Sequence, residues 1–200
     1  MACTGTHCIQ DKVSPAYRNI LIGALFINGA MFLLESLMSA KAGSVSLFAD
    51  SLDFLGDAAN YGISLFVLSK SLKTRAKASL IKGGTMLIFG VAVLFSTLYA
   101  YWQGNLPNHS EMGAVGILAL LANVGTAWML YRHKDGDSNR QSVWLCSRND
   151  AIGNIAVVLA AVAVYFTGSN LPDLVVALAM ALLAIQAAWV VMKQAWAELR

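Results

Sequence analysis

The last apolar run of the sequence, residues 171–192, reads LPDLVVALAMALLAIQAAWVVM. It contains one charged residue, Asp173. A bilayer-spanning helix needs about 20 mostly apolar residues, because the hydrocarbon core is ~30 Å thick and each residue adds ~1.5 Å. A helix also satisfies its own backbone hydrogen bonds, which lipid cannot do. This run therefore predicts a transmembrane helix. The same test predicts five more, at about 19–39, 45–68, 80–102, 111–131 and 140–166.

The composition of the 200-residue chain also favours a membrane protein. Apolar residues make up 58%, charged residues only 12%, and the mean hydropathy is +0.61. A soluble domain carries about 25% charged residues. The net charge of +3 is too small for a typical nucleic-acid-binding protein, and three cysteines do not make a disulfide framework. The first 18 residues lack the apolar core of a signal peptide. We therefore expect an all-α, polytopic membrane protein, a bundle of six transmembrane helices.

Short polar links separate the predicted helices and carry most of the positive charge. Turn residues occur at 42–44, 103–108 and 167–170. When the links alternate across the membrane, 13 of the 14 Lys and Arg residues fall on one side and only Lys41 on the other. The positive-inside rule then places both termini in the cytoplasm, at a cell or inner membrane. We expect a cytoplasmic tail (1–18), a six-helix membrane domain (19–196) and a short cytoplasmic end (197–200).

The predicted span at 45–68 carries three carboxylates and an amide. A charged side chain at mid-bilayer costs at least about 2.5–3.5 kcal/mol on insertion scales, so such residues indicate a functional site. At 100° per residue, the four side chains fall in one stripe about 80° wide. The span contains no Lys or Arg, so the stripe needs a cation, protons or a basic partner. These residues are Asp50, Asp53, Asp57 and Asn60.

The span at 140–166 repeats the (i, i+4) spacing of Asp53 and Asp57 with Cys146 and Asp150. Two facing helices with such pairs can deliver four oxygen and sulfur ligands to one point, which suits a tetrahedral Zn²⁺ site. Further polar residues lie on this span and on two others, either as support for that site or as interhelical hydrogen bonds. They are Asn28, Glu35, Asn123 and Asn154. Glu35 could alternatively reach the headgroups, and Asp173 suits the dipole of its own helix.

With these residues the chain resembles the cation diffusion facilitator transporters. The family usually has His or Asp, three residues, then Asp in its second span, as at Asp53 and Asp57. It usually has Trp-Leu-His, three residues, then Asp in its fifth span; here Trp144-Leu145-Cys146 and Asp150 fit, with Cys in place of His. Other positions that match the family's spacing are Asn28, Glu35, Asn123, Tyr165-Phe166-Thr167-Gly168 and Asp173.

The resemblance implies a transporter, not an enzyme, that exports a divalent transition metal (Zn²⁺, Co²⁺, Ni²⁺ or Cd²⁺) in exchange for protons. The metal is the transported substrate and no cofactor is implied. Its ligands would be Asp53, Asp57, Cys146 and Asp150, with Asp50 as a relay or a supporting residue. Protons compete with metal for such ligands. The family's usual cytoplasmic C-terminal domain and His-rich loop are not expected, because the sixth span ends near the C-terminus and only His133 lies in that loop.

Several alternatives remain open at this point. The chain could be an uptake carrier or channel for the same metals, or a membrane partner that does not transport. An intramembrane aspartyl protease is remote, because Phe54 stands where its Gly-x-Gly-Asp pattern needs the first glycine. Gly83-Gly84 could allow close helix packing, including in a homodimer. A metal-acquisition role is open for three soft ligands in the N-terminal tail: Cys3, His7 and Cys8.

Overall fold

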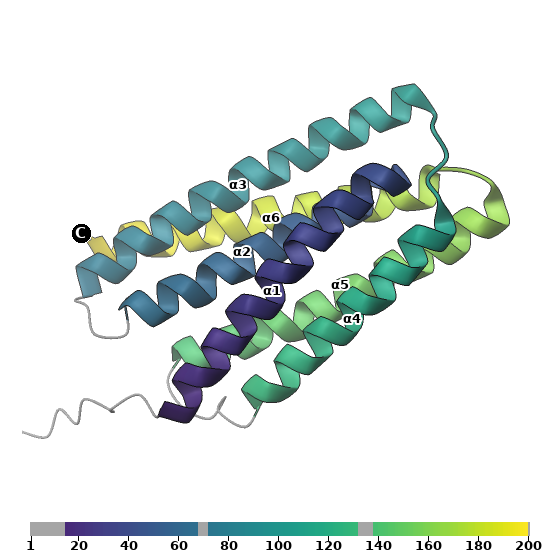
Figure 1. The fold of residues 1–200 in the computed structure, drawn as a ribbon. Helices are drawn as coiled ribbons and strands as arrows, with labels where there is room; N and C mark the ends of the chain where they lie inside the picture. Colours follow the sequence, from purple (N-terminus) through teal and green to yellow (C-terminus); the bar gives the residue numbers. More distant parts are fainter. Residues whose placement is uncertain (1–14, 68–71, 132–137, 200) are drawn as a thin grey trace, which may run out of the picture.

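The computed structural model describes residues 15–67, 72–131 and 138–199, and all regular structure in these ranges is α-helical (Figure 1). The predicted six-helix, all-α architecture is thereby confirmed. Five helices are longer than the predicted spans, most of all α3 at its start and α6 at its end, and α2 is one residue shorter. They are α1 (Pro15–Ala42), α2 (Val45–Val67), α3 (Leu72–Gln103), α4 (His109–Tyr131), α5 (Ser138–Thr167) and α6 (Leu171–Leu199).

Five of the helices described contain a stretch that is long and apolar enough to cross a membrane. The exception is α2, because its three aspartates lower its hydropathy. This helix is nevertheless as long as a membrane span, and it packs against each of the other five. Of its three aspartates, Asp50 is buried, Asp57 is half-buried and Asp53 is exposed in the isolated chain.

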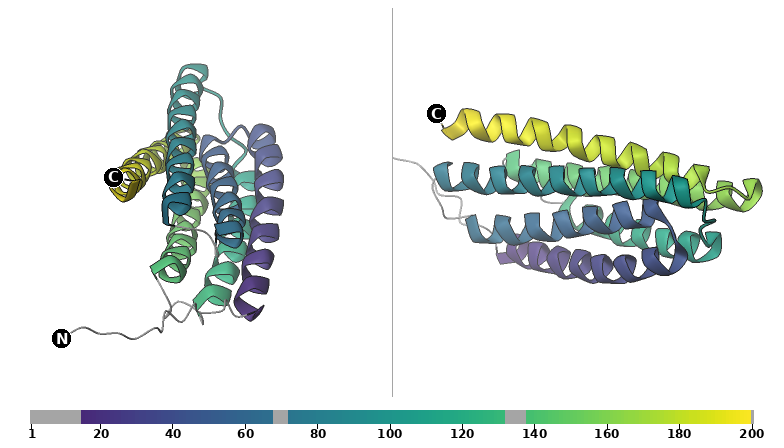
Figure 2. Two further views of the ribbon diagram at one scale, coloured as in Figure 1. Left: turned by 90° about the vertical axis from the view of Figure 1, so that its left-hand side faces the viewer. Right: turned by 90° about the horizontal axis from the view of Figure 1, so that it is seen from above.

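The helices pack as three pairs, α1 with α2, α4 with α5, and α3 with α6 (Figures 1 and 2). The first two pairs make a four-helix group, and the α3–α6 pair lies against its α2 and α5 side. Because the chain runs up and down, Pro15 and Leu199 lie at one end, here called the terminal end. The opposite end, called the turn end, holds Gly43, Gly104 and Gly168.

These three glycines end α1, α3 and α5 in the same way. Each has a positive φ, of 66°, 65° and 59° in chain order, which glycine adopts without a steric penalty. The Gly104 and Gly168 amides donate to the carbonyls of Ala100 and Val164, four residues earlier. The predicted turns are therefore glycine C-caps, and they bring successive helices back antiparallel.

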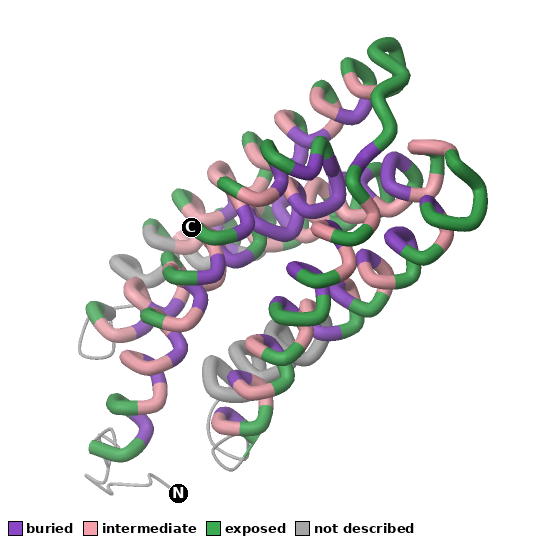
Figure 3. Tube along the Cα trace, turned by 45° about the vertical axis from the view of Figure 1, so that its right-hand side comes forward, coloured by how far each residue is buried: buried purple, intermediate pink, exposed green. Residues whose placement is uncertain are grey.

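Exposed positions occur along every helix (Figure 3), and many of them are large apolar residues. Large side chains such as Trp102 (84% exposed) and Phe166 (78%) point outward. A soluble protein rarely exposes apolar surface on this scale, whereas lipid is the matching solvent. Together with the five membrane-length helices, this surface identifies an integral, multi-pass membrane protein.

The interior of the four-helix group alternates between apolar and polar levels. Near the terminal end, Tyr17, Leu21, Ala24, Tyr61 and Leu130 form one apolar cluster. Met31, Phe54 and Ala119 form the second cluster, here called the middle layer. The third lies near the turn end and consists of Ala42, Leu47, Met112, Val115, Val157, Ala160 and Ala161. The buried carboxylates and amides lie between these clusters.

The α3–α6 pair is unusually close at two glycines of α3. A Cβ added to Gly83 would lie 2.5 Å from Met192 Cγ, and one added to Gly90 would lie 2.7 Å from Ile185 Cγ1. Small residues permit such an approach in membranes. The close packing predicted at Gly83 therefore occurs within the chain, against α6, whereas Gly84 faces open space.

Candidate metal site

The central position of α2 divides its three aspartates among different neighbours. Asp50 lies within hydrogen-bonding distance of Glu35 on α1, and Asp57 lies within hydrogen-bonding distance of Asp150 on α5. Asp53 instead points toward α3 and α6. The predicted stripe about 80° wide is kept in the helix. Because α2 contacts five other helices, side chains at slightly different angles within the stripe meet different neighbours.

The Asp57–Asp150 pair brings together one predicted ligand of α2 and one of α5. Tyr61, one turn further along α2, donates its hydroxyl to Asp57 Oδ2 at 3.2 Å. Lys82 of α3 lies within electrostatic range of Asp57. In the sequence, Lys82 counts only among the 13 Lys and Arg residues that set the predicted orientation. The signal that could have found it is its place inside the predicted span at 80–102, where a charge needs a reason.

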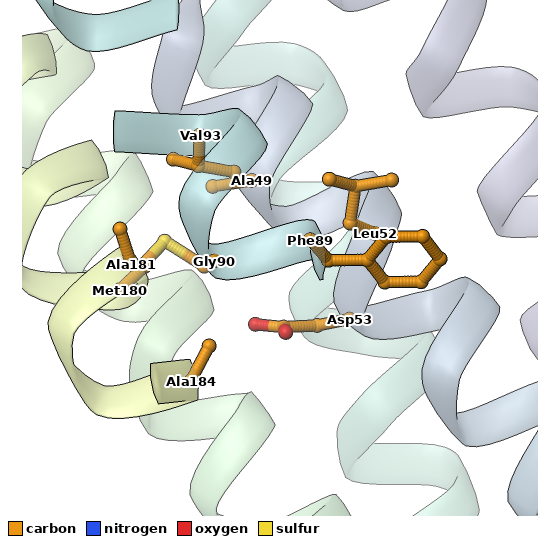
Figure 4. Close-up of a pocket in the computed structure, with 9 residues that line it drawn as sticks. All are labelled: Ala49, Leu52, Asp53, Phe89, Gly90, Val93, Met180, Ala181 and Ala184. Atoms are coloured by element: carbon orange, nitrogen blue, oxygen red, sulfur yellow. The ribbon is translucent and has the colours of Figure 1, made fainter. Parts of the chain in front are cut away.

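Asp53 points into a small pocket between α2, α3 and α6, where its carboxylate faces Ala184 and Met180 (Figure 4). It is an exposed residue of the isolated chain. Asp53 also lies within electrostatic range of Asp57 and Asp150, so the three carboxylates share one region of the bundle. Gly90 of α3 lines the same pocket, at the point where α3 approaches α6 closely.

The four predicted ligands are thus placed unequally. Asp57 and Asp150 are together, and Asp53 is nearby but turned toward α3 and α6. The side chain of Cys146 lies outside the residues described, as do Cys3, His7 and Cys8. Among the side chains that are described, no three His, Cys, Asp or Glu residues are gathered as a metal-binding group.

Amide side chains occupy the same region of the four-helix group. Asn28, Asn123 and Asn154 are fully or almost fully buried, and Asn60 is half-buried. Asn28 donates to the Ala24 carbonyl of its own helix at 2.8 Å, so this bond is not interhelical. Within the described ranges, no partner bonds Asn28 Oδ1, Asn123 Oδ1 or either polar atom of the Asn154 side chain. Such buried groups are usually satisfied by water, an ion or a ligand.

Glu35 is fully buried, with an exposed fraction of 0%. The alternative that its carboxylate reaches the headgroups is therefore wrong. A glutamate near the end of a long membrane helix can extend to the interface, but this one lies on the face of α1 that packs against α2. It meets Asp50 there, so the two acids form a second carboxyl pair.

Asp173 of α6 is also buried, and its carboxylate bonds to the start of α2. Its carboxylate accepts hydrogen bonds from the hydroxyls of Ser44 (2.7 Å) and Ser46 (2.6 Å). It also accepts the backbone amides of Val45 (2.8 Å) and Ser46 (3.1 Å). The interpretation that Asp173 suits the dipole of α6 is incomplete, because this carboxylate caps the first turn of α2 from the neighbouring helix.

A bundle of six membrane helices whose central helix carries interior carboxylates defines a membrane transporter for cations. The sequence profile described as "Cation efflux transmembrane domain" matches residues 21–199. The chain therefore belongs to the cation efflux family, also called the cation diffusion facilitators. Members of this family are transporters, which removes the protease alternative.

The relatives found are bacterial metal transporters. The chain is 24% identical over 209 residues to the zinc transporter ZitB of Escherichia coli, covering 98% of this chain and 66% of that protein. It is 21% identical to ZitB of Yersinia pestis (90% and 62% covered). It is 22% identical to a "Cadmium, cobalt and zinc/H(+)-K(+) antiporter" of Bacillus subtilis (87% and 60% covered). The chain thus spans about three fifths to two thirds of their length.

Proposed function

We propose that the protein exports divalent transition-metal ions, Zn²⁺ above all, in exchange for protons. The metal is cargo, and it would be held between α2 and α5 by Asp57 and Asp150, together with Asp53 and Cys146. The observation that carries the proposal is the Asp57–Asp150 pair, because two half-buried carboxylates that face each other from neighbouring helices need a positive partner. The names of the relatives, which include zinc, cadmium and cobalt, support the choice of metals.

Proton exchange follows from the chemistry of the ligands. Carboxylate and thiol ligands bind metal in their deprotonated form, so metal entry releases protons and metal departure favours their return. A thiolate favours Zn²⁺, Cd²⁺ or Co²⁺, whereas carboxylates favour harder ions, so a mixed set suits borderline metals. The Lys82 ammonium, within range of Asp57, would stabilise the empty site and would be repelled when a divalent ion arrives. Cytoplasmic termini would place the turn end at the outer face.

The test uses the full chain in proteoliposomes that contain a pH dye. Zn²⁺, Co²⁺, Ni²⁺, Cd²⁺ and Mn²⁺ are added in turn, and proton movement is recorded. Asp57→Asn should abolish metal-driven proton movement, because it removes a ligand and a proton acceptor. Glu111→Gln is the matched control, because Glu111 pairs with exposed Lys41 at 2.8 Å, away from this site. Full activity in Asp57→Asn would contradict the site, and metal flux without proton movement would indicate a channel.

A further inference from the structure

The Glu35–Asp50 pair is a second set of buried acids, about two turns along α2 from Asp57 and within electrostatic range of Asp53. Glu35 is 0% exposed and Asp50 is 1% exposed. They come from α1 and α2 and lie within hydrogen-bonding distance of each other. Neither residue is a ligand in the proposed Asp57–Asp150 site. The mechanism proposed above therefore gives this pair no role.

The middle layer separates the two carboxyl pairs. On α2, Phe54 lies one turn from Asp50 and about one turn from Asp57, and it is 2% exposed. On α1, Met31 lies one turn from Glu35. Phe54, Met31 and Ala119 contact one another across α1, α2 and α4. The Glu35–Asp50 pair therefore occupies its own polar level, nearer the turn end.

The helices around Glu35 offer it no positive charge. Among the described residues α1 packs only against α2 and α4, and neither helix contains a Lys or Arg. The nearest basic residue on α1 itself is Lys41, which pairs with Glu111. Within the described part of the chain, no donor reaches either Glu35 oxygen or Asp50 Oδ2, apart from a proton that the two carboxyls would share.

Such a pair does not stabilise the fold by itself. Two carboxylates in an apolar surrounding repel each other, and burial without a partner is costly. Proteins retain buried acids of this kind when a ligand offsets their charge. One divalent cation carries the charge that two carboxylates require, and carboxylate oxygens are ordinary ligands for Zn²⁺ and related ions.

We propose that Glu35 and Asp50 form a second cation-binding site for the transported metal, between the Asp57–Asp150 pair and the turn end. This inference rests on the proposed function, since it assigns the same cargo to a later point on its route. Two protein ligands leave the rest of the coordination shell to water. The second site therefore binds metal more weakly than the first, which suits a site from which the ion leaves.

The experiment is a metal titration of the purified full chain in detergent, with Cd²⁺ as the probe and calorimetry as the readout. The wild type should bind two ions per chain, the second at least tenfold more weakly. Glu35→Gln and Asp50→Asn should each remove the weaker phase and keep the tighter one. Asp57→Asn should do the reverse. Glu35→Asp, which keeps the charge, should retain the weaker phase, and Glu111→Gln should retain both.

The outcomes separate the two proposals. A wild type that binds one ion, or a Glu35→Gln protein that keeps both phases, overturns the second site. A folded Glu35→Gln protein that loses both phases places Glu35 in the first site and also overturns the proposal. A tight phase that survives in Asp57→Asn contradicts the proposed function instead, and leaves the assignment of the weaker phase to Glu35 and Asp50 standing. Elution as a single symmetrical species establishes folding for each variant.

Discussion

Asp173 and Glu35 are both buried carboxylates in the half of the bundle nearer the turn end, and each lies against α2. The Asp173 carboxylate accepts four hydrogen bonds from the first turn of that helix. Glu35 receives none from the described residues and faces another acid instead. Burial alone therefore does not tell what an acid does in a membrane protein. The hydrogen-bond donors around the acid distinguish the two roles. A carboxylate with several donors stabilises the fold, and a buried carboxylate without donors is a candidate ligand for a cation.

The strongest test of this contrast is Asp173→Ala. The substitution leaves two backbone amides and two hydroxyls without their acceptor, and charge-assisted hydrogen bonds are the stronger kind. We expect stability to fall by about 4 kcal/mol, which corresponds to a decrease of about 10 °C in the melting midpoint for a chain of this size. The measurement is thermal unfolding in detergent. A decrease no larger than that of Glu111→Gln, which removes the ion pair with exposed Lys41, would contradict the structural role of Asp173.

Added metal should affect only the unsatisfied acids. At 100 times its dissociation constant, Zn²⁺ should stabilise the wild type by about 2.7 kcal/mol through binding to the native state. Asp173→Ala should gain the same increment from its lower starting point, because its metal ligands are intact. Asp57→Asn should gain much less. Equal gains in all three proteins would show that metal acts elsewhere.

A smaller effect should follow from removing one donor of the Asp173 cap. Ser46→Ala deletes a 2.6 Å hydrogen bond but leaves the three others. We expect a loss of about 1 kcal/mol, or about 3 °C in the melting midpoint. Ser39→Ala is the control, because the Ser39 hydroxyl bonds to the Ser36 carbonyl within its own helix. Similar losses of stability in Ser46→Ala and Ser39→Ala would mean that the hydrogen bond to Asp173 adds no more than a bond within one helix.

The smallest change is expected from Glu35→Gln in the absence of metal. No hydrogen bond from another described side chain or backbone amide is lost, because none reaches the Glu35 oxygens. The melting midpoint should stay within about 2 °C of the wild type, corresponding to less than about 0.5 kcal/mol. A decrease approaching that of Asp173→Ala would show that Glu35 stabilises the fold, and Glu35 and Asp173 would then not differ in role.

The sequence predicted the architecture well for a physical reason. A membrane-spanning run is about 20 residues long, so its signal is strong, and glycines at 43, 104 and 168 ended helices where turns were expected. Helix periodicity also placed Asp57 and Asp150 on facing helices. Periodicity within one helix, however, does not tell which neighbour each side chain meets.

Two findings required knowledge of which neighbouring helix each side chain meets. The partner of Asp173 lies 127–129 residues away in the chain, and no spacing rule connects α6 to the first turn of α2. The separation of Asp53 from Asp57 depends on α2 being surrounded by five helices, which is a property of the whole bundle. Glu35 was recognised as an interior polar residue, but its burial against Asp50 followed only from packing.

The seven-residue interval between Asp50 and Asp57 also has an electrical meaning. It corresponds to ~10 Å along the helix axis, or about a third of the hydrocarbon thickness. An elementary charge crossing the full membrane field gains about 2.3 kcal/mol per 100 mV, so a divalent ion crossing a third of it gains about 1.5 kcal/mol. A voltage of 100 mV would therefore shift the relative occupancy of the two acidic pairs roughly tenfold. The membrane potential would then act as a second driving force on the metal ion as it moves along α2.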